Sequence, residues 1–595
     1  MRYLLTLTAI SLFSFNAFSQ GLPVVRTYSY HTLQFNAGGS QNSSYEPLSQ
    51  RLFSVNAAEN KVEILKISDL EKSYRVGRID VSSYGAKVNS VSTHDNLVAV
   101  TMSNNFPQAS GKIVFFDTLG NYLNQLTVGP NPIKVRFSPS LQHFVTVNEG
   151  NPSDDYSSDP MGSLSVINFV SGNAQNLTQA DVTTIDFSRY DTTAYDPLIR
   201  VFGNNGQASF SADMEPQGIG FNSNGSKAFV SLQENNALAI INLFPPSLDT
   251  IVALGFKDHN LSGQGLDASD QKASIDIAQQ FNLFGMYQPD ELACYEVNGS
   301  TYILSANEGS ARDYSGYSEV ERINNVNLSP FTFNNSSQLQ NDTVLGRLKV
   351  TTTLGNKTNG IQHDSLFSFG TRSFSVWDEN GQLVWDSGDE FEQNLALLQA
   401  ANFNSDYDNN SSFKNRSDDM GPQPKAIAVG EVDGNWYAFI GLNRMGGIMI
   451  YNVNNPQAPS FDSYILDRDF SKSANDTASG DLGPKHILFI PATESPNGIA
   501  LLAVSNEVSG NISLYQIGQG IGLSQFNDEQ LLEVYPNPSK GIFHLSKAAS
   551  LKVYRADGTL VGTFSGQDKI DLSQEASGLY LIKDASGKAL RIIKK

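Results

Sequence analysis

Four acidic residues recur at the same point of a repeated phrase in this chain. They are Glu149, Glu234, Glu308 and Glu507. Each follows Asn or Gln, and each phrase ends an apolar run typical of a β-strand. A fifth copy has Asn443 and Arg444 at the corresponding positions. Carboxylate and amide oxygens suit hard cations such as calcium, and carboxylates with a metal and arginines would suit a phosphate ester.

A proline precedes each phrase by a similar number of residues. The prolines are Pro132, Pro216, Pro289 and Pro484, with Pro424 before the fifth copy. Self-similarity at a long period indicates a repeat architecture. In a closed repeat fold, a polar group at the end of equivalent strands collects on one face, so we expect the four acids to lie near one another.

Composition narrows the function classes. The chain has 60 acidic and 40 basic residues and a formal charge of -20, which argues against nucleic-acid binding. Its single cysteine, Cys294, cannot form an intrachain disulfide. Because Cys294 lies in an apolar strand-like run, we expect a buried structural thiol.

Residues 1–20 combine one Arg, a short apolar stretch and small polar residues, which is typical of a secretory signal peptide. No later stretch approaches the ~20 apolar residues that a membrane-spanning helix requires. The sequence therefore predicts an exported protein without a transmembrane segment.

Short runs rich in Val, Ile, Phe and Tyr, separated by Gly, Asn, Asp and Pro, predict an all-β fold. Paired strands form seven units between residues 51 and 517, which fits a seven-bladed β-propeller. The strand expected at 24–33 would complete the last blade. Helices are expected at 390–401 and, from a weaker pattern, at 273–281.

A Gly-rich linker at 518–530 precedes a small module at 531–595. Its strands and turns predict a β-sandwich. The stretches YPNPSKGIF, YRADGTLV, IDLSQEASGLYLI and RIIKK closely resemble the C-terminal sorting domain of the type IX secretion system. The resemblance implies a Gram-negative bacterium of the Bacteroidetes, export by this machinery through 531–595, and either release or attachment at the cell surface.

The body also resembles a family, the choice-of-anchor I propellers, which are related to WD40 and YVTN-type repeats. The matching stretches include RLFSVNAAENKVEIL, ANEGSARDY, RSFSVWDENGQLVWDSG and AFIGLNRMGGIMIYNV, and they span nearly all of 24–517. The resemblance implies a propeller over 21–517 but no common activity. Some members are labelled alkaline phosphatase or phytase-like.

We call the repeated Asn-Glu or Gln-Glu phrase at the strand ends the refrain. We expect an unknown extracellular ligand to bind at the refrains and their neighbouring arginines. The candidate ligand-binding residues are Glu149, Glu234, Asn307, Glu308, Arg312, Arg372, Arg444, Asn506 and Glu507. Asp406, Asp408 and Asn410 match the start of a calcium loop, although Ser411 replaces the usual glycine and no Glu closes it. Asn and Glu at strand ends also commonly satisfy turn backbone groups, so a purely structural role stays open.

Two functions are compatible with these residues. The first is a secreted or cell-surface scaffold for binding or adhesion. The alternative is a calcium-dependent phosphoesterase in which Glu149, Glu308 and Glu507 hold the metal and Arg312 or Arg444 holds phosphate; no catalytic residue is assigned. Lysines beside the repeat prolines disfavour a divalent cation there; they are Lys134, Lys425 and Lys485.

Overall fold

The computed structural model describes residues 21–595 except 139–142, 170–171, 357–359, 519–533, 556–558 and 585–588. The chain divides into two compact units, Met1–Ile521 and Gly522–Lys595. The predicted signal peptide and nearly all of the predicted linker lie outside the described residues. None of the helices in the described part of the chain has the length and apolar character needed to cross a lipid bilayer.

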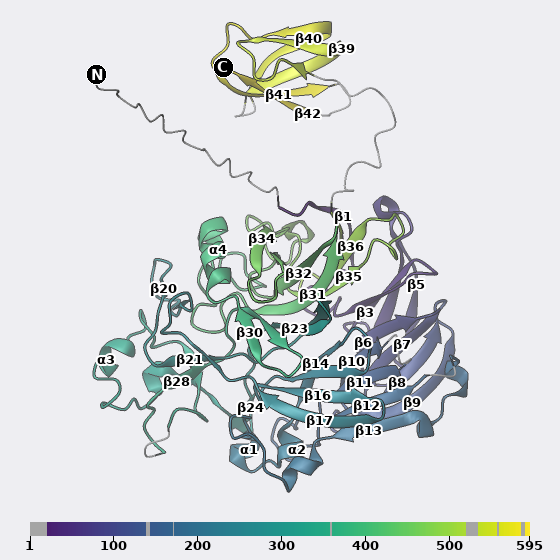
Figure 1. Ribbon diagram of the computed structural model, residues 1–595, viewed down its shortest axis with the longest axis vertical. Helices are drawn as coiled ribbons and strands as arrows, with labels where there is room; N and C mark the ends of the chain where they lie inside the picture. Colours follow the sequence, from purple (N-terminus) through teal and green to yellow (C-terminus); the bar gives the residue numbers. More distant parts are fainter. Residues whose placement is uncertain are drawn as a thin grey trace, which may run out of the picture. The chain divides into compact units, whose positions relative to one another are not determined.

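The larger unit is all-β and propeller-like, with seven four-stranded antiparallel sheets among its described residues (Figure 1). The first sheet is β2 (Ser43–Glu46), β3 (Arg51–Asn56), β4 (Lys61–Lys66) and β5 (Tyr74–Asp80). The second is β6 (Lys87–His94), β7 (Leu97–Ser103), β8 (Ser110–Asp117) and β9 (Tyr122–Pro130). The third is β10 (Pro132–Ser138), β11 (His143–Asn148), β12 (Ser163–Asn168) and β13 (Val182–Asp186). The fourth is β14 (Pro216–Phe221), β15 (Lys227–Leu232), β16 (Ala237–Leu243) and β17 (Pro246–Ala253).

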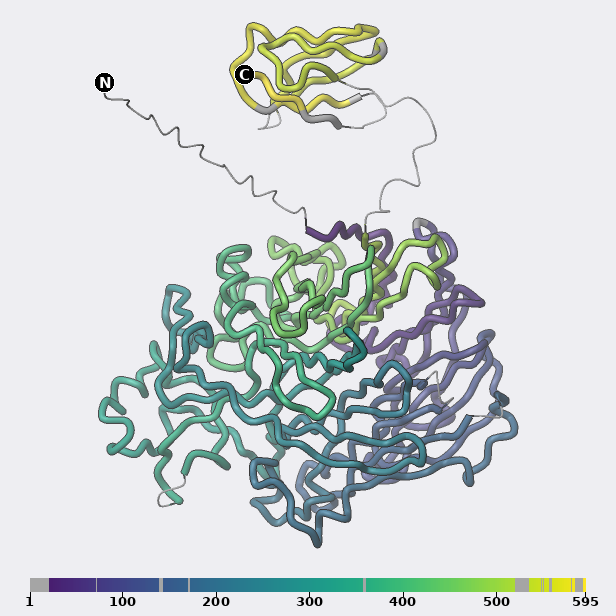
Figure 2. The backbone as a smooth tube through the Cα atoms, in the orientation of Figure 1, coloured from purple at the N-terminus to yellow at the C-terminus, as the bar shows by residue number. Residues whose placement is uncertain are grey.

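The last three sheets return the chain to its start. The fifth is β22 (Leu292–Val297), β23 (Ser300–Ala306), β29 (Phe374–Asp378) and β30 (Leu383–Asp386). The sixth is β31 (Pro424–Val432), β32 (Asn435–Leu442), β33 (Ile448–Asn452) and β34 (Ser460–Ile465). The seventh is β35 (Pro484–Ile490), β36 (Ala500–Asn506), β37 (Asn511–Ile517) and β1 (Val24–His31). Because β1 pairs with β37, the first and last strands of this unit lie side by side (Figure 2), which confirms the expected pairing.

Apolar side chains hold consecutive sheets together. The second strand of a sheet is buried along its length, as in β7 and β36, because its side chains enter a core on both faces. Phe53 of the first sheet and Val98 of the second share one apolar cluster. Leu501 of the seventh sheet packs with Leu52 of the first, so the series closes on itself.

Insertions before and within the fifth sheet form a separate five-stranded sheet. Its strands are β18 (Phe256–Asp258), β21 (Leu283–Met286), β28 (Leu366–Ser368), β27 (Lys349–Thr351) and β26 (Val320–Arg322). Two small hairpins pair β19 (Leu266–Asp267) with β20 (Ile277–Ala278) and β24 (Asp313–Tyr314) with β25 (Tyr317–Ser318).

Helices are short. The α-helices are α1 (Gly203–Gly206), α2 (Phe210–Asp213), α3 (Ser336–Leu339) and α4 (Glu390–Leu398). The 3-10 helices are η1 (Leu70–Lys72), η2 (Ala174–Asn176), η3 (Gln179–Asp181), η4 (Ser188–Asp191), η5 (Ile323–Asn325), η6 (Ala400–Asn402) and η7 (Thr477–Ser479). The helix expected at 390–401 is confirmed as α4, which ends at Leu398. The helix expected at 273–281 is wrong, because the carbonyls of Lys272 and Ser274 accept hydrogen bonds from Lys414 and the segment contributes β20 instead.

The smaller unit differs from the predicted β-sandwich. Its strands are β38 (Val534–Tyr535), β39 (Ile542–Arg555), β40 (Leu560–Asp571), β41 (Gly578–Asp584) and β42 (Ala589–Lys594). These strands belong to one sheet, because the long β39 pairs with β38, β40 and β41. The sheet curls around its own core, which includes Phe543, Val553 and Ile570.

Candidate functional site

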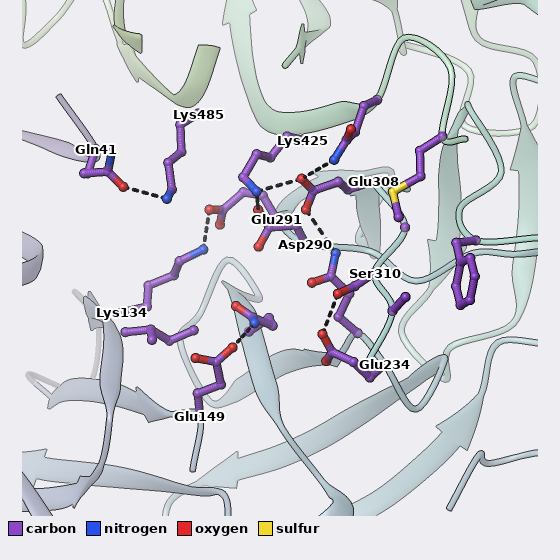
Figure 3. A pocket seen from close by; sticks show the side chains of 18 of the residues that line it. Gln41, Lys134, Glu149, Glu234, Asp290, Glu291, Glu308, Ser310, Lys425 and Lys485 are labelled. Atoms are coloured by element: carbon purple, nitrogen blue, oxygen red, sulfur yellow. Dashed lines mark hydrogen bonds and ion pairs between the residues drawn. The ribbon is translucent and has the colours of Figure 1, made fainter. Parts of the chain in front are cut away.

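The first strands of the seven sheets surround a polar cavity of about 700 Å³ (Figure 3). All seven sheets contribute a polar side chain at or just before their first strand. In ring order these side chains are Gln41, Lys87, Lys134, Gln217, Glu291, Lys425 and Lys485. The cavity therefore gathers one polar position from each repeat.

The repeat prolines start the strands that line this cavity. Pro424 and Pro484 are the first residues of β31 and β35, and the pairing register shifts directly after each of them. The residues left out of the register are Lys425 and Lys485. A bulge re-aims side chains, and both lysines line the cavity.

Backbone hydrogen bonds connect two of the refrains to the start of their own sheets. The backbone N–H of Glu149 donates to the carbonyl of Asn131, 3.0 Å away, which directly precedes Pro132. The N–H of Glu507 likewise donates to the carbonyl of Gly483, 2.8 Å away, which precedes Pro484. The refrains that end at Glu149 and Glu507 are thus tied to the residue before their own proline.

The amides of the refrain have a structural role where they bond to the neighbouring strand. Asn307 is buried and donates from Nδ2 to Ser375 Oγ of β29 at 2.7 Å. Asn148 bonds in the same way to Ser165 of β12 at 3.0 Å. Asn506 is also buried, and neither it nor Asn307 lines the cavity.

Most charges at the cavity are paired. Lys425 Nζ lies 2.7 Å from Glu308 Oε1 and 3.5 Å from Asp290 Oδ2 (Figure 3). Lys485 Nζ lies 3.2 Å from Glu507 Oε2. The refrain acids Glu149, Glu234 and Glu308 line the cavity, whereas Glu507 does not line it but pairs with Lys485, which does.

The pKa values of these acids separate according to their neighbours. Burial would raise the pKa of Glu507, but Lys485 and Lys425 lower it to about 2. Burial, followed by repulsion from Glu234, raises the pKa of Glu149 to about 7. Burial also raises the pKa of Glu234. Glu149 and Glu234 are therefore easier to protonate than Glu507.

The predicted arginines fall into two groups. Arg312 is buried, and its Nη2 lies 2.9 Å from Glu215 Oε1. Arg372 is buried and pairs with Glu392 at 2.7 Å. Neither lines the cavity, whereas Arg444 does. Arg444 Nη1 is bound to Asp406 Oδ1 at 2.9 Å.

The oxygens proposed for calcium already have protein partners. Asp406 accepts from Arg444, and Asn410 Oδ1 accepts from Arg468 Nε at 2.8 Å. Asp408 Oδ2 lies 3.5 Å from Asn36 Nδ2. Within the described ranges, no group of three His, Cys, Asp or Glu side chains is placed to hold a metal ion. Asp406 and Asn410 are therefore bound to arginine side chains.

Calcium is therefore expected to leave the melting temperature of the purified protein unchanged, within about 1 °C, because a ligand stabilises a fold only when it binds the folded state. Differential scanning calorimetry with calcium and then with excess chelator measures this. A rise of several degrees that the chelator reverses would contradict the assignment of Asp406 and Asn410 to arginine pairs.

Several residues that line the cavity were not singled out from the sequence. Among them are Gln41, Lys87, Gln217 and Gln233. The position after each repeat proline was a usable signal for Gln217. Lys87 follows no proline, because β6 begins without one, so only the structure places it here.

A second cavity, of about 680 Å³, lies further along the same first strands, and His486 lines both cavities. Glu291 links the two, since it pairs with Lys134 at 2.5 Å and with Arg136 at 2.8 Å. Cys294 lines the second cavity and is partly buried. Burial raises the pKa of its thiol to about 12, which agrees with a structural thiol.

Comparison with curated proteins finds two partial relatives. Gigasin-3a of Magallana gigas is 31% identical over 191 residues, which are 30% of this chain and 66% of that protein. The mesenchyme-specific cell surface glycoprotein of Strongylocentrotus purpuratus is 28% identical over 316 residues, 47% of this chain and 40% of that protein. The chain thus spans less than two thirds of either relative.

The solved structures that match this chain share little sequence identity with it. Kuenenia stuttgartiensis hydrazine synthase is 9% identical with a TM-score of 0.39, over 80% of this chain and 95% of that chain. A streptogramin B lyase is 9% identical with a TM-score of 0.39, over 84% and 98%.

Family models cover both units. The Secretion system C-terminal sorting domain matches residues 533–595, which indicates a secreted or cell-surface protein of a bacterium and implies contact with the type IX machinery. The Choice-of-anchor I domain matches residues 41–456, more than half of the chain. The chain therefore belongs to the choice-of-anchor I family and ends in a secretion-system sorting domain.

Proposed function

We propose that the larger unit is a seven-bladed β-propeller that binds an extracellular ligand in its central cavity. The seven four-stranded sheets, closed by β1, would be its blades. The observation that carries the proposal is the cavity of about 700 Å³, to which all seven sheets contribute polar side chains. Pockets of this size, with a few placed polar groups, commonly hold small ligands.

The pairing of charges favours binding over metal-dependent hydrolysis. The phosphoesterase alternative needs Glu308 and Glu507 as metal ligands, but both are neutralised by lysines. It also needs Arg312 or Arg444 to bind phosphate, but Arg312 is buried against Asp213 and Glu215, and Arg444 pairs with Asp406. A bound divalent cation would have to displace ammonium groups, which costs the ion pairs they form.

The rest of the chain supports an extracellular role. We propose a signal peptide at 1–20, a propeller at 21–517, a linker at 518–530 and a sorting module at 531–595. One curated relative is itself named a cell surface glycoprotein. In this proposal the sorting module delivers the propeller outside a Gram-negative cell, and the propeller then binds or adheres.

A cavity-filling variant tests the ligand site. Ala311 lines the cavity on a segment without regular secondary structure, so Ala311→Trp is expected to block the cavity with little effect on the blades. A thermal-shift screen of amino sugars, sugar phosphates, uronic acids and short peptides is expected to yield a compound that stabilises the natural protein by a few degrees and leaves Ala311→Trp unshifted.

The matched control is Glu379→Gln, at an exposed turn position that does not line the cavity. It should respond to the same compound as the natural protein. If every stabilising compound acts equally on Ala311→Trp, the cavity is not the binding site and the proposed function is wrong.

A further inference from the structure

Charges that line the cavity are not all neutralised within the protein. Lys134 pairs with Glu291, and Lys425 pairs with Glu308 and Asp290. Elsewhere on the lining, Arg416 and Lys349 share Asp419. These pairs need no ligand. The remaining charged groups are the ones that a bound molecule could satisfy.

Two buried acids on the lining, Glu149 and Glu234, form no ion pair with any described residue, although the buried Arg312 attracts Glu234 and lowers its pKa against the effect of burial. Glu149 is 9% exposed, and its carboxylate accepts hydrogen bonds from Gln217 and from Asn131 at 2.9 Å, both neutral amides. Glu234 is 6% exposed, and its Oε1 accepts from Ser310 at 2.7 Å. Among the described residues, Glu234 Oε2 has no hydrogen-bond partner although it is buried.

Excess negative charge on this side has an electrostatic signature. Glu149 and Glu234 repel one another, and this repulsion adds to the effect of burial on the pKa of Glu149. Asp313, from β24, also lines the cavity and is exposed. An ammonium group placed between Glu149 and Glu234 would relieve the repulsion and supply the missing donor.

Basic groups without a full complement of partners lie elsewhere on the wall. Lys87, the first residue of β6, is exposed within the cavity, and none of the described residues forms an ion pair with it. Partial desolvation of its ammonium group, and then repulsion from Lys485, lower the pKa of Lys87, while attraction to Glu149 and Glu507 acts in the opposite direction. Lys485 and Glu234 lie on opposite sides of the cavity in Figure 3. Lys485 Nζ already bonds to Glu507 at 3.2 Å and to Gln41 Oε1 at 2.6 Å, which leaves one of its three N–H donors for a ligand. A bound anion would meet this donor and Lys87 together.

We propose that the cavity takes a small zwitterionic ligand, with its ammonium group between Glu149 and Glu234 and its anionic group at Lys87 and Lys485. This inference rests on the proposed ligand-binding function and names the class of ligand. The many amide and hydroxyl groups on the wall suit a hydroxylated or peptide skeleton. Phe369 is the one Phe, Tyr or Trp among the described residues that line the cavity, so recognition relies on charge and hydrogen bonds.

Ligands that carry both charges can be compared with matched analogues that carry only the ammonium group or only the anionic group. Glucosamine 6-phosphate carries both charges, glucosamine only the ammonium group, and glucose 6-phosphate only the phosphate. Calorimetric titration at low ionic strength, where such attractions are least screened, is expected to give a dissociation constant for glucosamine 6-phosphate at least ~10-fold lower than for either single-charge analogue. A second arm compares glycylglycine with its N-acetyl and amide forms, which distinguishes a peptide source from an amino sugar.

Two variants test which side of the cavity binds the ammonium group of the ligand and which side binds its anionic group. Glu234→Gln is expected to remove the advantage over glucose 6-phosphate, and Lys87→Met the advantage over glucosamine. Glu379→Gln and Lys72→Met, both at exposed positions outside the cavity, should keep the full preference. Circular dichroism confirms that each variant is folded.

The outcomes distinguish this inference from the proposed function. The proposal is overturned if single-charge probes bind as tightly as the zwitterions, or if no zwitterionic probe binds at millimolar concentration. In either case, a compound whose binding is blocked by Ala311→Trp would leave the proposed function standing. A zwitterion preference that survives both Glu234→Gln and Lys87→Met would place the site elsewhere and overturn the assignment.

Discussion

Replacing Arg312 with methionine is expected to lower the free energy of unfolding by about 3–5 kcal/mol, the usual cost of removing one partner from a buried charge pair. The Arg312 side chain is 1% exposed, and it pairs with Asp213 and Glu215. Its Nη2 also donates to the backbone carbonyl of Asp213 at 2.7 Å. Without the guanidinium, two buried carboxylates lose their countercharge.

Urea denaturation followed by tryptophan fluorescence measures this loss. Adding Asp213→Asn and Glu215→Gln to the variant should recover part of it, because the uncompensated charges are then gone. Arg189→Met, at an exposed position, should change stability by less than about 1 kcal/mol. If Arg312 instead held a phosphate ligand, one of the two arginine assignments in the phosphoesterase alternative, Arg312→Met would leave the unfolding midpoint almost unchanged.

Glu291→Gln is expected to cost about 3 kcal/mol at pH 7 and to make stability less sensitive to acid. Burial would raise the pKa of Glu291, but Lys134 and Arg136 lower it from 4.5 to about 2. A change of this size corresponds to roughly 3 kcal/mol. Because the folded-state pKa is the lower one, this stabilisation is complete above pH 4.5 and is lost as the pH falls toward 2.

Melting curves at several pH values check the sign. The difference in stability between natural protein and Glu291→Gln should be largest at neutral pH and should shrink below pH 4. Glu431→Gln is the matched control, since Glu431 is an exposed acid on the first strand of the sixth sheet. Parallel curves for the natural protein and Glu291→Gln at all pH values would show that Glu291 does not stabilise the join between the two cavities.

The strands were predictable because their cause is local. Apolar runs such as the one that ends before Glu507 are buried on both faces in the structure, as their composition requires. The refrain also predicted which end of the strands would share a surface, and Glu149, Glu234 and Glu308 do line one cavity. Lysines beside prolines pointed to mixed charge, and Lys425 and Lys485 provide it.

The arginines were harder because their partners are distant in sequence. Arg312 follows the refrain of the fifth sheet, but Asp213 belongs to α2, before the fourth sheet. Arg372 meets Glu392 of α4 and the carbonyl of Asp267, which an insertion brings alongside. No local sequence pattern predicts such contacts. The position of Lys87 on the cavity wall was likewise not predictable, because no repeat proline precedes it.

The pairing of β1 with β37 determines when the ring of sheets can close during folding. During synthesis Val24 emerges first and its partner Ile517 emerges last among the ring residues. Closing a loop of this length costs about 5 kcal/mol in chain entropy, and only the completed seventh sheet repays it. The ring therefore closes late, and the contact that seals it is among the most non-local in the molecule, which favours slow folding. A chain stopped before residue 511 would retain most of its sheets but leave β1 as a free edge, open to pairing with other chains.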